Sequence, residues 1–100
     1  MEERYFYVVI EEITAGIKAL DISEAERERL YGLVNETINR YEELTNGSLQ
    51  RQAGLEKLAE SERRLADNLG TLKLQGTLAL FGVEQLEKVI EEFRKKEQSS

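Results

Sequence analysis

Apolar residues recur at steps of three and four along the first twenty positions, the spacing of one face of a helix. Six successive aromatic and β-branched residues, Tyr5 to Ile10, leave a strand open as an alternative for the beginning of this segment. We expect a helix, because the stripe continues well beyond this run. Its members are Phe6, Val9 or Ile10, Ile13, Ile17 and Leu20.

A second helix is marked at both of its ends. Ser23 followed by Glu26 is a capping box, in which the hydroxyl accepts from the Glu26 amide and the carboxylate reaches back. Asn46-Gly47 supplies the left-handed residue that ends such a helix, and Ser48 can cap the next one. The apolar stripe in between is Leu30, Val34, Ile38, Tyr41 and Leu44 or Thr45.

From Leu55 to Phe93 the three-four spacing keeps one phase, which is typical of a single coiled-coil helix. A continuous helix over residues 48–96 would be about 70 Å long, a length that suits a dimer of long helices. Gly70, Gly76 and Gly82 argue against it, because each costs about 1 kcal/mol in a helix interior.

We therefore predict a break near Phe81-Gly82 and a last helix from Val83 to about Lys96. A hairpin near residues 71–81 is an alternative, because leucines alternate on either side of Gln75-Gly76. The pattern as a whole predicts an all-α fold, an antiparallel bundle of about four helices. It forms a single domain over residues 1–96, followed by a frayed tail at 97–100.

The composition removes most chemistry from consideration. The 100 residues include no Cys, His, Pro or Trp, so the thiolate, the usual neutral-pH base and the commonest metal ligand are all missing. Glu84, Glu87 and Glu91 share one helix face, but Lys88 and Arg94 are interspersed, which is typical of a salt-bridged solvated surface. We predict no catalytic residue, no metal and no cofactor, and hence a protein that is not an enzyme.

Charge is unevenly divided along the chain. Residues 1–47 carry eleven acidic and five basic side chains, whereas residues 48–100 carry nine of each, giving the net charge of −6. An acidic half favours a basic protein partner and disfavours nucleic acid and anionic membranes. No apolar run approaches the roughly 20 residues of a membrane span, and none fits a signal peptide, so we expect a cytoplasmic protein.

Aromatic residues are the strongest candidates for a binding surface. Tyr5, Phe6 and Tyr7 fall on consecutive faces of the first helix, which cannot bury all three in its own core. Tyr31 lies beside the stripe of the second helix in the same way. Tyrosine is enriched at interfaces, so these four residues are predicted to bind a protein partner or to form a homodimer seam.

Residues 71–93 resemble the phosphoacceptor region of histidine-phosphotransfer (HPt) domains. The family pattern is roughly His-x-Leu-Lys-Gly, five further residues, Gly, and Leu four residues later; Leu74, Gly76, Gly82 and Leu86 fall in register with it. The resemblance implies a four-helix bundle. It also implies a partner face formed by Leu72, Gln75, Gly76 and Ala79.

Two departures from this pattern remove the family's chemistry. Leu72 stands at the place of the phosphoaccepting histidine, and Gln75 at the place of the lysine. Phosphoryl transfer needs a nucleophilic nitrogen with positive charge nearby, which neither residue supplies.

Three functions follow as hypotheses. The first is a non-enzymatic, acidic adaptor, inhibitor or regulator that docks a protein partner through a helix face. The second is a degenerate HPt-like protein that binds a receiver domain or sensor kinase without accepting phosphate. The third is a small phage-type anti-defence inhibitor that mimics DNA.

Overall fold

Four helices make up the secondary structure of the described residues. The computed structural model describes residues 3–47, 50–71 and 78–99. The helices are α1 (Glu3–Lys18), α2 (Glu24–Thr45), α3 (Arg51–Thr71) and α4 (Leu78–Ser99), with no strand in these ranges. The all-α prediction is therefore confirmed.

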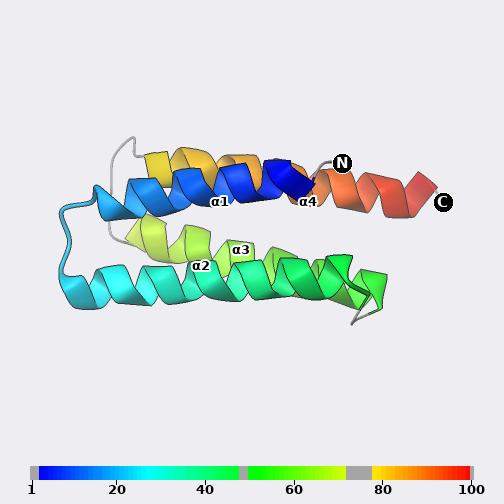
Figure 1. Cartoon of the computed structure of the whole chain (residues 1–100), viewed down its shortest axis with the longest axis horizontal. Coiled ribbons are helices and arrows are strands. Elements are labelled where there is room, and N and C mark those ends of the chain that lie inside the picture. The colour runs from blue at the N-terminus through cyan, green and yellow to red at the C-terminus, as the bar shows by residue number, and fades with distance from the viewer. Residues whose placement is uncertain (1–2, 48–49, 72–77, 100) are drawn as a thin grey trace.

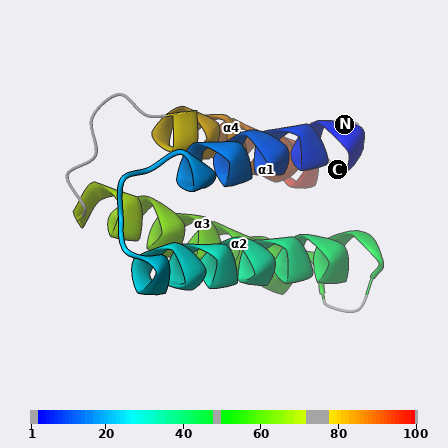
Figure 2. The same cartoon turned by 60° about the vertical axis from the view of Figure 1, so that its left-hand side comes forward.

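Neighbouring helices run antiparallel and form an elongated bundle of 44 × 22 × 22 Å (Figure 1). Helix α1 packs most extensively on α4, and α2 on α3; the α3–α4 contact is smaller and the α1–α2 contact is the smallest. Figure 2 shows the result, an α1–α4 layer lying on an α2–α3 layer. This is the up-down arrangement that short connections favour.

The turn from α1 to α2 is fixed by its capping groups. The predicted capping box is present, since Ser23 Oγ accepts from the Glu26 amide at 3.2 Å and the Glu26 carboxylate accepts from the Ser23 amide. Arg27 then reaches back and donates to the carbonyl oxygens of Ile17 at 2.6 Å and Leu20 at 3.1 Å. A guanidinium thereby adds donors at the end of α1, where the Ile17 carbonyl also accepts from the Leu20 amide at 3.1 Å.

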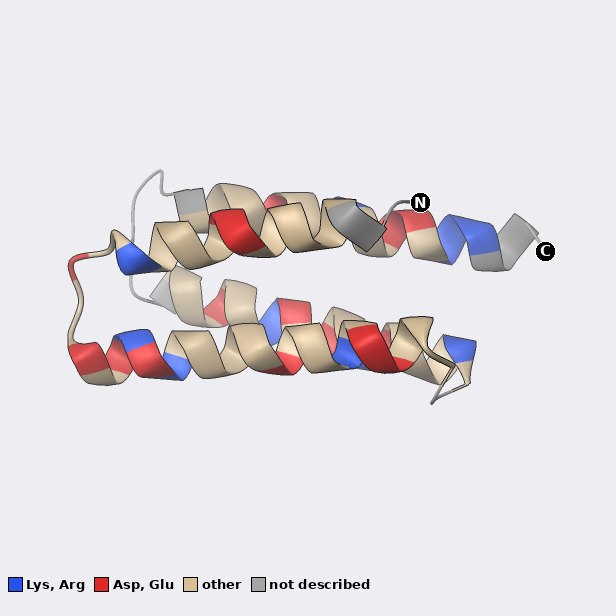
Figure 3. Ribbon diagram, viewed as in Figure 1, with Lys and Arg blue, Asp and Glu red and all other residues tan. Residues whose placement is uncertain are grey.

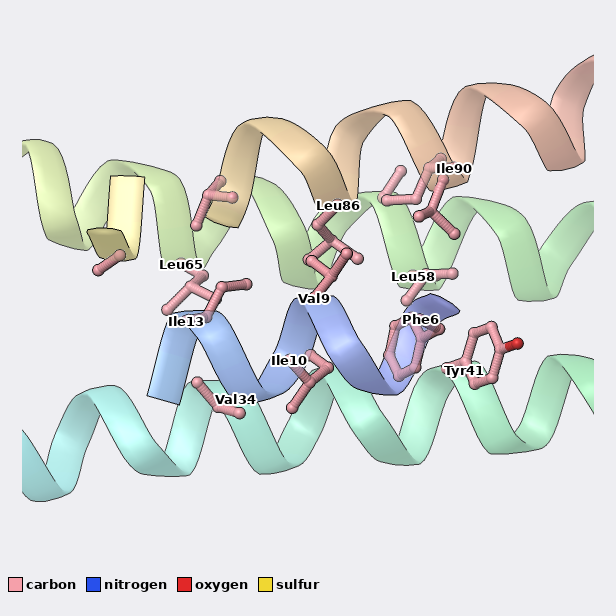
Figure 4. Close-up of a cluster of buried hydrophobic side chains, with 14 of the residues drawn as sticks. Phe6, Val9, Ile10, Ile13, Val34, Tyr41, Leu58, Leu65, Leu86 and Ile90 are labelled. Carbon is pink, nitrogen blue, oxygen red and sulfur yellow. The ribbon is translucent and has the colours of Figure 1, made fainter. Parts of the chain in front are cut away.

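The core has an aromatic cluster at the end of the bundle where α1 begins. Phe6 is fully buried and stacks on Tyr41 of α2, with ring centroids 3.7 Å apart and planes 3° from parallel (Figure 4). The edge of Phe93, from α4, meets Tyr41 at 5.9 Å. Three helices are thus held together at one level by aromatic side chains, and aliphatic residues fill the rest of the core.

The predicted break near Phe81-Gly82 is wrong, because α4 begins at Leu78 and both residues lie within it. A Cβ at Gly82 would lie 2.5 Å from Ile13 Cγ1 and 3.3 Å from the Ile13 amide nitrogen. This glycine therefore serves the close approach of α1 and α4 rather than a change in chain direction.

Both alternative folds are also wrong for the described residues. Helices α3 and α4 are separate and pack on each other, so no single helix spans residues 48–96. Leu78 and Leu80 are helical, which removes one strand of the hairpin, while Leu72 and Leu74 lie outside the described residues. Helix α4 extends three residues past the expected end at Lys96; fraying of residues 97–100 stays a prediction.

Candidate functional site

Four large apolar side chains are exposed in the part of the chain that the structure describes. They are Tyr5 (40% exposed), Tyr7 (37%), Val8 (41%) and Phe81 (51%). The first three come from the beginning of α1 and the fourth from the beginning of α4. Single exposed apolar residues are ordinary on a protein surface, so their relative positions decide whether they form a site.

Three of these residues share one face of the bundle. The Tyr5 hydroxyl donates to Oε1 of Gln85 at 3.1 Å, which places Tyr5 on the side of α1 that adjoins α4. Phe81 lies one turn before Gln85, and Val8 one turn after Tyr5, and residues at these spacings are neighbours on a helix surface. We call the surface formed by Tyr5, Val8, Phe81 and Gln85 the α1–α4 face.

The two helices that carry this face pack closely on each other. At Gly82 the backbone of α4 comes so near to Ile13 that no Cβ fits between them, and Ala79, one turn earlier, is fully buried. Small residues at a crossing let two helices approach closely, so their outer ridges meet in one surface instead of standing apart. The exposed side chains of α1 and α4 therefore lie on adjoining ridges on one side of the bundle, with Phe81 beside the Ile13 level of α1.

Few of the described side chains of α1 are charged. Among the described side chains of α1, the charged ones are Glu11, Glu12 and Lys18. Figure 3 shows a red segment in the middle of α1 and a blue segment at its end, with tan between them, whereas the neighbouring α2 carries acidic and basic residues along most of its length. The α4 side is charged, because Glu84 lies one turn after Phe81 and Lys88 one turn after Gln85.

The four aromatic residues predicted to bind a partner lie in three different places. Phe6 does not belong to the surface, because the stack with Tyr41 buries it completely in the core. Tyr7 leans to the opposite side of α1 from Tyr5, and its hydroxyl donates to Glu42 of α2 at 3.0 Å. Only Tyr5 lies on the α1–α4 face.

Tyr31 is half-buried against the core and is distant from the other tyrosines. It lies eleven residues before Glu42, the partner of Tyr7, which is about 16 Å along α2. Sequence reasoning missed Phe81 as a surface residue. The available signal was an aromatic residue that falls off the apolar stripe of its own helix.

Only one of the four residues predicted to form the HPt-like face lies among the described residues. Leu72, Gln75 and Gly76 lie outside the described residues. Ala79 is fully buried, so the expectation that it faces a partner is wrong. It belongs to the stripe of α4 that packs into the core, together with Val83 and Leu86.

One carboxyl group has a perturbed environment. Burial, and secondly the nearby Glu87 carboxylate, raise the pKa of Glu62 above the ordinary value of 4.5, against the opposing effect of Arg63. Within the described ranges no group of three or more acidic side chains has the arrangement of a metal site. The predicted salt-bridged face is present in part, as Arg94 pairs with Glu91 at 3.2 Å.

No helix in the described segments is both long and apolar enough to span a membrane. Comparison with protein-family models, curated proteins and solved structures found no match to this chain. The HPt resemblance therefore stays a prediction. The α1–α4 face is the feature from which a function is best inferred.

Proposed function

We propose that this chain is a non-enzymatic protein-interaction module that docks through the α1–α4 face and acts as an adaptor, inhibitor or regulator. The observation that carries the proposal is the gathering of Tyr5, Val8 and Phe81 on one side of the bundle. Covering apolar area recovers about 25 cal/mol per Å², and aromatic anchors supply much of the affinity in protein interfaces.

Folding of the single chain does not account for these three side chains. The core beneath them is already filled by Phe6, Val9 and Ile13, each exposed by 1% or less. Exposed apolar residues add little to the stability of the monomer, whereas polar residues at the same positions would favour solubility. Contact with another molecule gives their apolar character a physical role.

The occupant we propose for this face is a second copy of the chain. Glu12, one turn after Val8, and Lys88, one turn after Gln85, put opposite charges on this face, so two copies can meet there in spite of the net charge of −6. A twofold axis would place each copy's α1 and α4 against the same helices of the other, as self-complementary interfaces do. The charged surface of α2 would stay in water.

Light scattering after size-exclusion chromatography, run over a range of concentrations, tests the proposal. The triple variant Tyr5→Gln/Val8→Gln/Phe81→Gln is expected to be monomeric where the parent is dimeric. Tyr7→Gln is the matched control, since it removes an exposed tyrosine from the other flank of α1 and should dimerise like the parent. Circular dichroism checks that each variant keeps its helices.

A parent chain that is monomeric at every concentration would reject self-association. Chemical crosslinking in the native host would then compare the parent with the triple variant. If the parent and the triple variant capture the same proteins equally well, the α1–α4 face is not a docking surface, and the proposal fails.

A degenerate phosphotransfer module is the second candidate function. The feature that favours it is the antiparallel four-helix architecture, which the HPt resemblance implies. The parent should bind a phosphorylated receiver domain without acquiring label, and Leu72→His should acquire it. Absence of receiver binding by both proteins would overturn this candidate.

A further inference from the structure

A groove follows the seam between α3 and α4, away from the contacts already described. It consists of two adjoining hollows of about 270 and 420 Å³, which share Glu62, Ala66 and Glu87. Along α4 the lining extends from Leu80 to Arg94, which corresponds to about 21 Å of helix. Four turns of a helical peptide have the same length.

Small and apolar residues form the floor of this groove. Ala59 and Ala66 lie two turns apart on α3 and leave space that larger side chains would fill. Leu80 and Val83 of α4 line one hollow and Ile90 the other. The floor can therefore accept apolar side chains from a segment that lies along the seam.

Acidic residues line one end of the groove. Glu62, Glu84 and Glu87 flank the hollow next to Leu80, and none of them belongs to the ion pairs found among the described residues. Burial of Glu62 beside Glu87 leaves two carboxylates close together in a partly dehydrated place, which raises the pKa of Glu62. A cation placed there would relieve their repulsion.

The other end of the groove has a mixed character. Arg63 and Arg94 line it together with Glu91, and Arg94 pairs with Glu91. The charge along the groove is therefore graded, from acidic near Leu80 to balanced near Arg94. Such a gradient distinguishes the two directions in which a charged segment could lie.

Half of the six acidic side chains on α2 are already in ion pairs. On α2, Glu24 pairs with Arg27, Glu43 with Arg40, and Glu36 with Arg64 of α3. These pairs already neutralise much of the acidic surface between residues 24 and 43. The groove, in the half of the chain with balanced charge, is the better place for a cation.

We propose that the α3–α4 groove binds a basic amphipathic helical segment of a protein partner, with its apolar side chains on the floor and its Lys or Arg residues at the Glu62–Glu84–Glu87 end. Helix-in-groove docking of this kind uses apolar anchors at helical spacing and charge to fix direction. The groove is separate from the α1–α4 face, so this binding does not depend on the function proposed above.

Fluorescence anisotropy with a synthetic peptide tests the proposal on the full chain. The probe is a labelled helical peptide of about 15 residues, the length of the groove, with Leu on one face and Lys on the other. A peptide with Glu in place of every Lys is the control probe. The parent is expected to bind the Lys peptide more tightly than the Glu peptide, and less tightly at high salt.

Two sets of charge-removing substitutions separate the groove from net charge. Glu62→Gln/Glu84→Gln/Glu87→Gln should weaken binding about tenfold at low salt, from three lost ionic contacts. Glu28→Gln/Glu56→Gln/Glu92→Gln makes the same change in net charge at exposed positions elsewhere and should have less than about a twofold effect. Ala66→Leu, which fills the floor, should also weaken binding.

Equal losses in the two charge variants would show attraction by net charge only and would overturn the proposal. Failure of the parent to bind the Lys peptide would overturn it as well. The Tyr5→Gln/Val8→Gln/Phe81→Gln variant should keep the parent's affinity for the peptide. Unchanged peptide binding by this variant would show that the groove and the α1–α4 face act independently.

Discussion

Helices α1 and α4 approach so closely at Gly82 that a Cβ there would lie 2.5 Å from Ile13 Cγ1. At the α2–α3 seam, a Cβ on Gly54 would lie 3.0 Å from Leu44 Cδ1, the end of a flexible side chain. A neutral hydrogen bond from Tyr5 to Gln85 crosses the first seam, whereas the second is crossed by the Arg64–Glu36 ion pair at 2.7 Å.

The two helix pairs therefore have different roles in the bundle. The α2–α3 pair has a less tight glycine contact and an ion pair between its helices, and α2 has further ion pairs along its charged outer surface. The α1–α4 pair depends on close apolar contact and keeps apolar side chains on its outer face. The pair that keeps apolar side chains on its outer face is the one that we propose is covered by another protein.

Phe6→Ala should have the largest effect on stability, because Phe6 anchors the α1–α4 pair to α2 through its stack with Tyr41. We expect a loss of about 3–5 kcal/mol in the free energy of unfolding. Tyr5→Ala, one residue away but exposed, should cost less than about 1 kcal/mol. Urea unfolding followed by circular dichroism measures both; similar losses would contradict the assignment of Phe6 to the core and Tyr5 to the surface.

A series of glycine-to-alanine substitutions compares the two seams directly. Gly82→Ala should destabilise by about 1–3 kcal/mol, because its new methyl meets Ile13 and the backbone of α1. Gly54→Ala should cost less, since the end of Leu44 can move. Gly32→Ala, with nothing within 4 Å, should stabilise by up to about 1 kcal/mol. Thermal unfolding checks this order, and a stable Gly82→Ala variant would disprove the close approach.

A double-mutant cycle on the Arg64–Glu36 pair tests the charged link of the α2–α3 seam. Both side chains are partly exposed, so the coupling free energy from Glu36→Gln and Arg64→Gln should be about 0.2–1 kcal/mol. It should shrink as salt is added. A coupling that is independent of salt would mean that the pair acts through packing instead of charge.

The smallest effect we predict is the pH dependence caused by Glu62. Because burial and Glu87 raise its pKa, the folded chain keeps a proton there at a pH where the unfolded chain has lost it. Asp67 acts in the same direction as Glu87, while Arg63 and Arg94 act against it. Stability should therefore fall as the pH rises from the ordinary value of 4.5 through the raised pKa, and stay lower above it.

Glu62→Gln removes this loss and should be more stable than the parent at neutral pH, with the difference vanishing in acid. Thermal unfolding of parent and variant over a pH series measures the difference, and Glu56→Gln is an exposed control on the same helix. A parent and variant with the same pH profile would disprove the effect.

Local signals predicted the helices well. The capping box at Ser23 and the left-handed Gly47, with φ of 79°, are both present, because these features depend on neighbouring residues alone. The stripe of α2 was less accurate, since Thr37 is fully buried and Ile38 is only partly so. The Thr37 hydroxyl donates to the Leu33 carbonyl, and this hydrogen bond allows a polar residue to be buried in the core.

The features that depend on contacts between helices could not be predicted from the sequence. A glycine such as Gly82 permits either a break or a close approach, and only the position of Ile13 decides between them. The periodicity of α1 shows that Tyr5 and Tyr7 leave its core side. It does not show that Tyr5 turns toward α4 and Tyr7 toward α2, because that depends on which helices pack beside it.

Docking of a second copy on the α1–α4 face is tested most directly by a site-specific photo-crosslink from that face. Benzoylphenylalanine replaces Phe81 in one sample and Tyr31 in a matched control, and mass spectrometry maps the crosslinked peptides between copies. We expect crosslinks from position 81 to α1 or α4 of a second copy, and none from position 31. Crosslinks from position 31 alone, or from position 81 to α2 or α3 of the second copy, would contradict it.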